Sequence, residues 1–293
     1  MQYLDKKNSD GSPLEVTAVK WAERISIHCL EKTKKTEIYA ILKTFFQNDY
    51  LEIFFRSLYF TGAKPIADKI ALNEWEIKNR SGYNLSKINI NLFQVKEYLQ
   101  DFLILNNIKF ENTIDAYVVK IKFFKIYRYF KNFIKKIIFK ITKKKQTIKD
   151  SSAKIAVAYN EGIDLDKRSD LFWLKNSKIN PNDIILYFEY RDQLNRHGKK
   201  EDLFRNAKKL GIQVINLWEH DNASEVDFSA ELITKLKNLD FSSSEEESLK
   251  KISLELINKF KYWYLFFKKF NIKIHMDAKD FGQDIIIKYL ALY

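Results

Sequence analysis

The chain has 293 residues, of which 46% are hydrophobic and 30% charged, so it holds enough apolar material for about two packed domains and is not a disordered chain. The low counts of 7 glycines and 3 prolines disfavour an all-β architecture with many tight turns, and the single cysteine excludes an internal disulfide and fits a reducing cytoplasm. The opening residues lack the apolar core of a signal peptide, and no apolar run is long enough to cross a membrane.

Residues 1–111 predict a helical domain, which we interpret as a packing and positioning module. Apolar side chains recur at helical spacing from Leu14 to Cys29, and Cys29 is expected to be a buried small hydrophobe. Ser12 and Pro13 favour a helix start, with Ser12 as the cap. We expect further helices at 36–47, 49–60, 64–79 and 91–105, with breaks at Gly62 and at Ser81-Gly82.

Residues 112–150 predict a basic amphipathic helix followed by a linker. The stretch Ala116–Lys149 holds 12 Lys or Arg and no acid, so the rest of the chain carries only +1 of the formal +13 (13 minus 12). Apolar residues from Phe123 to Ile141 recur at steps of 3 and 4 and form one stripe, with the cations on its flanks. We interpret this segment as a contact to an anionic membrane surface, made by Phe123, Lys125, Arg128, Phe130, Lys131, Lys135 and Lys136.

Other interpretations of the basic segment stay open. The stripe could pack on the flanking domains and expose only its lysines, or it could bind a partner helix. Nucleic acid ranks last, because no motif for RNA or DNA is present and the rest of the chain is near neutral. We therefore expect no nucleic-acid partner.

Residues 151–293 predict a Rossmann-like α/β domain with a parallel sheet. Short apolar runs that fit strands alternate with stretches that fit helices. The expected strands are 154–159, 183–190, 213–218 and 272–276, and the expected helices are 200–210, 245–270 and 284–292. The fold class expected for the whole chain is thus α/β, with a helical amino-terminal domain.

The strong motifs of known chemistry are absent. There is no glycine-rich dinucleotide fingerprint and no P-loop, and the four histidines lack metal-ligand spacing. We expect neither a metal site nor a bound cofactor. Candidate residues come instead from the segments that follow the predicted strands, where ligands bind in open α/β sheets.

The first candidate segment follows the first strand. Gly162 permits a tight turn or close approach of a ligand, and Glu161 and Asp164 could accept hydrogen bonds from sugar hydroxyls or act as a base. An ordinary turn with solvated acids is about equally compatible with this pattern.

Two further candidate groups follow later strands. Arg168 and Arg191 suit anion binding, although a surface ion pair explains Arg168 equally well. His275, Asp277 and Lys279 follow the last strand and are expected to cluster at the carboxyl edge of the sheet, where His275 suits proton transfer. Asp277 could equally be the cap of the last helix.

The carboxyl half resembles bacterial surface-polysaccharide biosynthesis proteins of the GT-B glycosyltransferase type. The resemblance rests on Lys154–Tyr159 and on the segments at 161–164, 167–174, 183–192 and 270–282. It implies two facing Rossmann-like domains, a nucleotide-sugar as donor substrate, no metal in principle, and a sugar or lipid-linked acceptor held by the amino-side domain. Glu161, Asp164 and His275 would then be the catalytic residues of the cleft.

The resemblance also implies a location and an incomplete site. Such proteins often act at the cytoplasmic face of the membrane, which fits the basic segment as a peripheral anchor. Only one Rossmann-like half is expected in this chain, which stops inside the apolar run Ile285–Tyr293, so a partner chain or a further domain would supply the donor site. The alternative is a non-catalytic membrane-associated scaffold or binding module.

Overall fold

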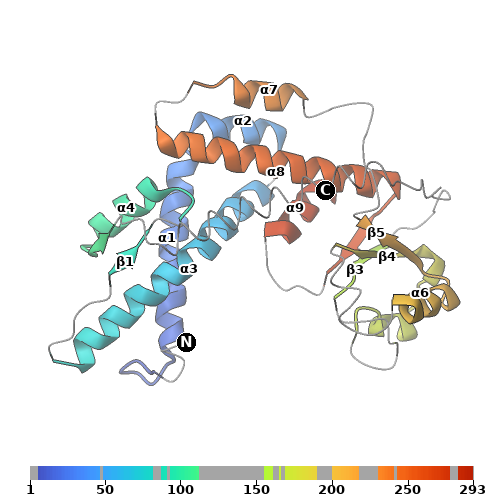
Figure 1. The fold of residues 1–293 in the computed structure, drawn as a ribbon, viewed down its shortest axis with the longest axis horizontal. Helices are drawn as coiled ribbons and strands as arrows, with labels where there is room; N and C mark the ends of the chain where they lie inside the picture. Colours follow the sequence, from blue (N-terminus) through green and yellow to red (C-terminus); the bar gives the residue numbers. More distant parts are fainter. Residues whose placement is uncertain are drawn as a thin grey trace. The chain divides into compact units, whose positions relative to one another are not determined.

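The computed structural model describes residues 6–46, 49–81, 87–90, 93–111, 155–160, 165, 169–189, 200–217, 230–240, 243–277 and 283–292. Over these ranges the protein is mostly helical with parallel sheets, so the α/β class expected from the sequence is confirmed (Figure 1). The chain divides into two compact units, one of Met1–Ile141 with Glu231–Leu254 and one of Thr142–Ala230 with Glu255–Tyr293.

This division differs from the expected domain ranges. Residues 231–254 were expected within the carboxyl-side domain but group with the first unit. One contact that ties them there is the hydrogen bond from the Ser244 hydroxyl to the carboxylate of Glu97. The predicted basic helix and linker, 112–150, lie outside the described residues. No helix in the described part of the chain is both long and apolar enough to cross a membrane.

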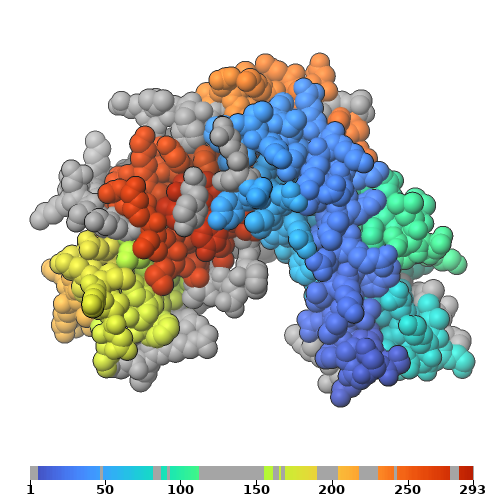
Figure 2. Space-filling view, turned by 180° about the vertical axis from the view of Figure 1, so that it is seen from behind, coloured from blue at the N-terminus to red at the C-terminus, as the bar shows by residue number. Residues whose placement is uncertain are grey.

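Helices form most of the first unit. Its described elements are α1 (Leu14–Thr33), α2 (Glu37–Phe45), α3 (Tyr50–Asn79), α4 (Lys96–Leu105), nearly all of α7 (Ala230–Lys237), the first part of α8 (Ser244–Lys269), and a short parallel pair of strands, β1 (Ile88–Asn89) and β2 (Phe110–Glu111). Alanines on α1 and α3 are fully buried and let the two helices approach closely. Figure 2 shows α1, in blue, with α4, in green, beside it.

Two expectations for this unit are wrong. Helix α1 begins at Leu14 with Pro13 at the N-cap position and has no side-chain cap. The oxygen of the Ser12 hydroxyl instead accepts a hydrogen bond from Asn8 Nδ2 at 2.9 Å. Helix α3 runs without interruption through Gly62, where a break was expected. The glycine serves close packing there, since a Cβ at this position would lie 2.4 Å from Oε1 of Gln94. The burial of Cys29 is confirmed.

A four-stranded parallel sheet organises the second unit. The four predicted strands all form, as β3 (Ile155–Ala158), β4 (Ile184–Phe188), β5 (Gln213–Asn216) and β6 (Ile274–Met276), and their order in the sheet is β5-β4-β3-β6. Along the chain, β4 is added beside β3 and β5 beside β4, and β6 then pairs with the other edge of β3. The strand order reverses at the boundary between β3 and β6.

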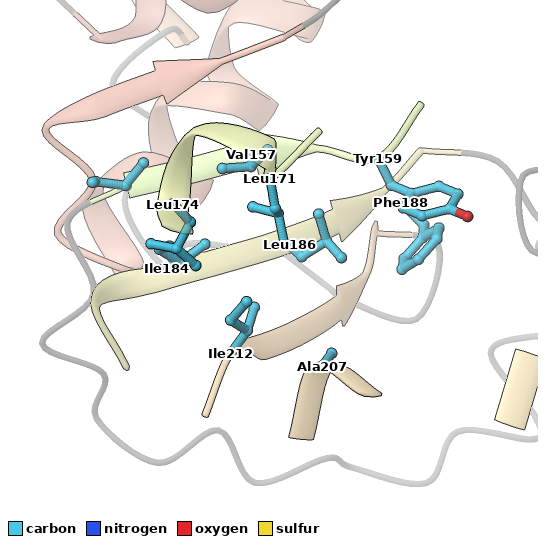
Figure 3. Close-up of a cluster of buried hydrophobic side chains, with 10 residues drawn as sticks. Val157, Tyr159, Leu171, Leu174, Ile184, Leu186, Phe188, Ala207 and Ile212 are labelled. Carbon is cyan, nitrogen blue, oxygen red and sulfur yellow. The ribbon is translucent and has the colours of Figure 1, made fainter. Parts of the chain in front are cut away.

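One face of this sheet packs on the 3-10 turn Phe172–Asn176 and on α6 (Lys200–Lys209). Figure 3 shows the side chains of Val157, Leu186 and Phe188 gathered on that face with Leu171 and Ala207. Alternate residues of each strand point to this face, as the two-residue period of a strand requires. Each large side chain buried here contributes roughly 1.5–3 kcal/mol.

The opposite face packs on the second part of α8. The ring of Tyr187 lies 5.5 Å from that of Trp263 and 5.7 Å from that of Phe266. His275 of β6 lies on the same face, and its ring is 5.7 Å from that of Phe267. The sheet of the second unit is therefore covered on both faces, and its polar side chains gather where the strands end.

Candidate functional site

Polar side chains follow three neighbouring strands at the carboxyl edge of the sheet. Asn160 follows β3 by two residues, Glu189 follows β4, and Asp277 follows β6. The strands are parallel and in register, so their ends meet at one edge. Asn160 Nδ2 donates to Asp277 Oδ1 at 3.1 Å and bridges β3 and β6. This bridge lies where the strand order reverses, which is the place where open α/β sheets bind ligands.

Lys288 of α9 (Gln283–Leu292) joins two of these strand ends. Its Nζ donates to Asp277 Oδ2 at 2.9 Å and to Glu189 Oε1. The side chains of Lys288, Glu189 and Asp277 are 1%, 8% and 2% exposed, so all three charges are buried. Buried charges of this kind are stable only when they are paired and hydrogen-bonded. We call Asn160, Glu189, Asp277 and Lys288 the strand-end cluster.

Two aromatic rings lie close to the ammonium group of Lys288. Nζ of Lys288 lies 4.7 Å from the centroid of the Trp263 ring and 5.4 Å from that of Tyr187. A cation over an aromatic face is stabilised by the ring quadrupole, most of all where water is excluded. The lysine is thereby held between two carboxylates and two rings.

Tyr187 and His275 meet across the middle strand. The Tyr187 hydroxyl and Nε2 of His275 are 2.6 Å apart. Between their strands lies β3, whose residues in register with them are Ala158 and Ala156. Because these alanines are small, the two longer side chains can reach each other above β3.

Burial fixes the protonation of this pair. It raises the pKa of the Tyr187 hydroxyl well above its usual value, and the nearby charges of Glu189 and Asp277 act in the same direction. Burial, reinforced by the charge of Lys288 and opposed by Asp277, lowers the pKa of His275 to about 3. At neutral pH the phenol is therefore protonated and the imidazole is neutral.

The second imidazole nitrogen of His275, Nδ1, is also buried. Within the described part of the chain, it has no hydrogen-bond partner. The tautomer of the imidazole decides whether the Tyr187 hydroxyl or the Nε2–H group is the donor in their hydrogen bond.

Asp170 holds the turn after β3. Its Oδ2 accepts a hydrogen bond from the backbone N–H of Asn160 at 2.7 Å, and Asp170 is itself buried. Trp173 Nε1 donates to the Asp170 carbonyl oxygen at 2.8 Å. Asn160 is therefore held at two points. Its backbone N–H is bound by Asp170, and its side-chain amide is bound by Asp277.

The structure brings together two of the site residues expected from the sequence. Asp277 belongs to the strand-end cluster, and His275 lies beside it in the sheet. Asp277 does not cap a helix, since α9 begins at Gln283 and the carboxylate binds Lys288. The other expected site residues lie outside the described residues: Glu161, Gly162, Asp164, Arg168, Arg191 and Lys279 for catalysis and substrate binding, and Phe123, Lys125, Arg128, Phe130, Lys131, Lys135 and Lys136 for the membrane.

Sequence reasoning placed Asn160 at the start of the first candidate segment without giving it a role, and it missed Glu189 and Lys288. Lys288 carries a signal in retrospect, because it is a lone charge inside the apolar run Ile285–Tyr293 and such a charge needs a buried partner. Glu189 directly follows a fully buried strand, which is a similar signal. The hydrogen-bond partners of these residues depend on the order of the strands in the sheet, which the sequence does not show. Among the described residues, no group of His, Cys, Asp or Glu side chains could hold a metal ion.

Comparisons of this chain with protein-family models, with curated proteins and with solved structures found no match.

Proposed function

We propose that this chain supplies the acceptor-side half of a glycosyltransferase, which moves a sugar from a nucleotide-sugar to a surface-polysaccharide or lipid-linked acceptor. The observation that carries the proposal is the strand-end cluster at the reversal between β3 and β6. In the proposed protein this edge faces a donor-binding half that a further domain or a partner chain provides. The strand order β5-β4-β3-β6 is compatible with one Rossmann-like half of a GT-B architecture.

The chemistry of the cluster suits a sugar ligand. Carboxylate oxygens accept hydrogen bonds from hydroxyls, and an amide both donates and accepts them. Asp277 and Asn160 provide these groups side by side, 3.1 Å apart. In this proposal they orient the acceptor, while Glu161 or Asp164 takes the proton of the attacking hydroxyl. His275 stays neutral and acts as a hydrogen-bonding group, because its burial opposes protonation.

The proposed place of work is the inner face of the cell membrane. Support comes from the cationic segment Ala116–Lys149, whose apolar stripe and flanking lysines suit an anionic surface. Each lysine near such a surface adds on the order of 1 kcal/mol. Flotation with anionic vesicles tests this part: the wild type should float, and a variant with Lys131, Lys135, Lys136 and Lys140 changed to Glu should not. A wild type that stays at the bottom would contradict it.

Turnover of nucleotide-sugars in the full-length protein tests the function itself. We expect Asp277→Asn to lower turnover at least about tenfold, because the cluster loses a charge-assisted hydrogen bond. Asp284→Asn is the matched control, since Asp284 lies on α9 in an exposed ion pair with Lys259. Equal turnover in the two variants would contradict the site. Absence of turnover in the wild type with every nucleotide-sugar tried would favour a non-catalytic binding module.

A further inference from the structure

His275 is a titratable side chain in the interior of the second unit. It is 8% exposed, and its Nε2 lies 2.6 Å from the Tyr187 hydroxyl. Within the described residues, its Nδ1 is buried without a hydrogen-bond partner. An imidazolium ion carries a proton on both nitrogens, so ionisation in this place would bury an N–H group without an acceptor. The imidazole therefore stays neutral as long as its cover is in place.

Side chains from three neighbouring elements cover the His275 ring. The ring of Tyr187 on β4 is stacked at 5.9 Å, that of Phe267 on α8 lies at 5.7 Å, and that of Tyr289 on α9 lies edge-on at 6.4 Å. Strand β4 and α8 are joined to each other by further ring contacts, such as that of Tyr187 with Trp263 at 5.5 Å. Departure of α9 would therefore uncover His275 and leave the packing of α8 on the sheet in place.

Helix α9 is held to the second unit by charges as well as by apolar contacts. Lys288 is 1% exposed and binds Glu189 and Asp277, which follow β4 and β6. The ion pair of Asp284 with Lys259 of α8 is exposed and therefore adds little. Without the buried ion pairs, α9 would depend on the apolar contacts of a helix of only 10 residues.

A proton on His275 would act directly on the buried ion pairs. Burial is the main reason why the pKa of His275 is lowered to about 3, and the charge of Lys288 acts in the same direction while Asp277 opposes it. An imidazolium would be a second buried cation that repels the ammonium of Lys288 and competes with it for Asp277. Both effects weaken the attachment of the helix that carries Lys288.

The other titratable groups near His275 do not cancel this effect. The phenols of Tyr187 and Tyr289 are uncharged at neutral and mildly acidic pH. The ring that faces His275 from α8 is that of Phe267, which does not titrate. The titratable side chains around His275 come from β4, β6, α9 and the strand ends: Tyr187, Glu189, Asp277, Lys288 and Tyr289.

We propose that α9 detaches from the sheet in mild acid, when His275 takes up a proton, while the strands and α8 stay packed. In the open state the imidazolium is exposed to water, and Lys288 has left Glu189 and Asp277. This opening is a property of the second unit alone and does not depend on the proposed transfer of a sugar.

Hydrogen exchange of the full chain at pH 7.5 and 5.5 tests the proposal by mass spectrometry. Protection factors, corrected for the intrinsic pH dependence of exchange, are compared between α9 and β3. An exposed histidine titrates near pH 6.5, so the open population should rise about tenfold between these pH values. We expect α9 to be less protected than β3 at both pH values and to lose about tenfold in protection at the lower pH.

Two results would overturn the proposal. Equal protection of α9 and β3 would show that α9 leaves only when the whole unit unfolds. Protection of α9 that does not change with pH would show that its opening leaves His275 covered. Both comparisons use the wild type, so they decide the matter even if a variant of His275 does not fold.

Variants assign the response to one histidine. His275→Gln lacks the titrating group, and we expect the protection of α9 in this variant to be the same at both pH values. His28→Gln is the matched control, because His28 is a half-buried histidine on α1 of the first unit. It should keep the tenfold response. Equal responses of α9 in the two variants would contradict the role of His275.

Discussion

Lys288 is the residue on which the carboxyl edge of the sheet depends. It is 1% exposed and donates to Glu189 and to Asp277, which end two strands that are separated by β3. The two carboxylates and the ammonium stabilise one another only as a set, because each charge has been removed from water. The stability of the sheet edge therefore depends on all three charges together.

Removal of the lysine charge should destabilise the second unit strongly. Lys288→Met leaves two buried carboxylates without their cation, and we expect a loss of about 3–5 kcal/mol in the free energy of unfolding. Urea unfolding measures this loss. The variant that also carries Glu189→Gln and Asp277→Asn should recover part of it, because no buried charge remains. A cost below about 1 kcal/mol for Lys288→Met would show that these charges are solvated.

His275 should make the protein sensitive to mild acid. Its folded-state pKa is about 3 against an ordinary value of 6.5, so between these values the unfolded chain binds the extra proton. The stabilisation is complete above pH 6.5 and is lost as the pH falls, by up to about 1.4 kcal/mol per pH unit.

The variant His275→Gln isolates this effect. It lacks the titrating group, so its free energy of unfolding should change less than that of the wild type between pH 6.5 and 5. Urea unfolding at several pH values provides the comparison. Parallel pH dependences in the two proteins would mean that His275 is not held in its neutral form by burial.

At the scale of elements, the strands were predictable and the details of the helices were less so. The runs that become β3, β4, β5 and β6 are short, mostly apolar and bounded by polar residues, so their length and composition identify them. The pair β1–β2 has two residues in each strand, which is too short to show any period. Helix α3 crosses both Gly62 and Pro65, because tertiary packing outweighs the local preference of these residues.

Gly62 offers a test of that packing. A Cβ at this position would overlap Oε1 of Gln94, whereas alanine is favoured over glycine within a helix by about 1 kcal/mol. We therefore expect Gly62→Ala to stabilise the protein by roughly 1 kcal/mol in the Gln94→Ala background and by clearly less in the wild type.

A thermodynamic cycle of the two single variants and the double variant measures this coupling. Thermal or urea unfolding gives each value. An equal effect of Gly62→Ala in both backgrounds would show that Gln94 does not occupy the space above the glycine.

At the scale of the whole molecule, the sequence predicted that the site lies at the carboxyl edge of the sheet. It did not predict which side chains meet there. His275 and Asp277 were identified because they lie at the end of a predicted strand, and parallel strands end at a common edge. Asn160 received no role, and Glu189 and Lys288 were missed, because the hydrogen bonds that join them to Asp277 or to each other span 117, 99 and 11 residues along the chain. Only the strand order and the placement of α9 bring these side chains together.

The two units have different roles in this account. The first is a helical unit whose core consists largely of leucine and isoleucine side chains, together with alanines and aromatic rings. The second unit holds the sheet and the strand-end cluster. In the proposed function the second unit carries the chemistry, and the basic segment 112–150 is the proposed membrane contact.

Steady-state kinetics of glycosyl transfer with varied acceptor and varied donor test whether the strand-end cluster holds the acceptor. We expect Asp277→Asn to raise KM for the acceptor about tenfold and to leave KM for the nucleotide-sugar unchanged, whereas Asp284→Asn should alter neither. A rise in KM for the nucleotide-sugar with KM for the acceptor unchanged would show the opposite, because it would place the donor at the edge proposed for the acceptor.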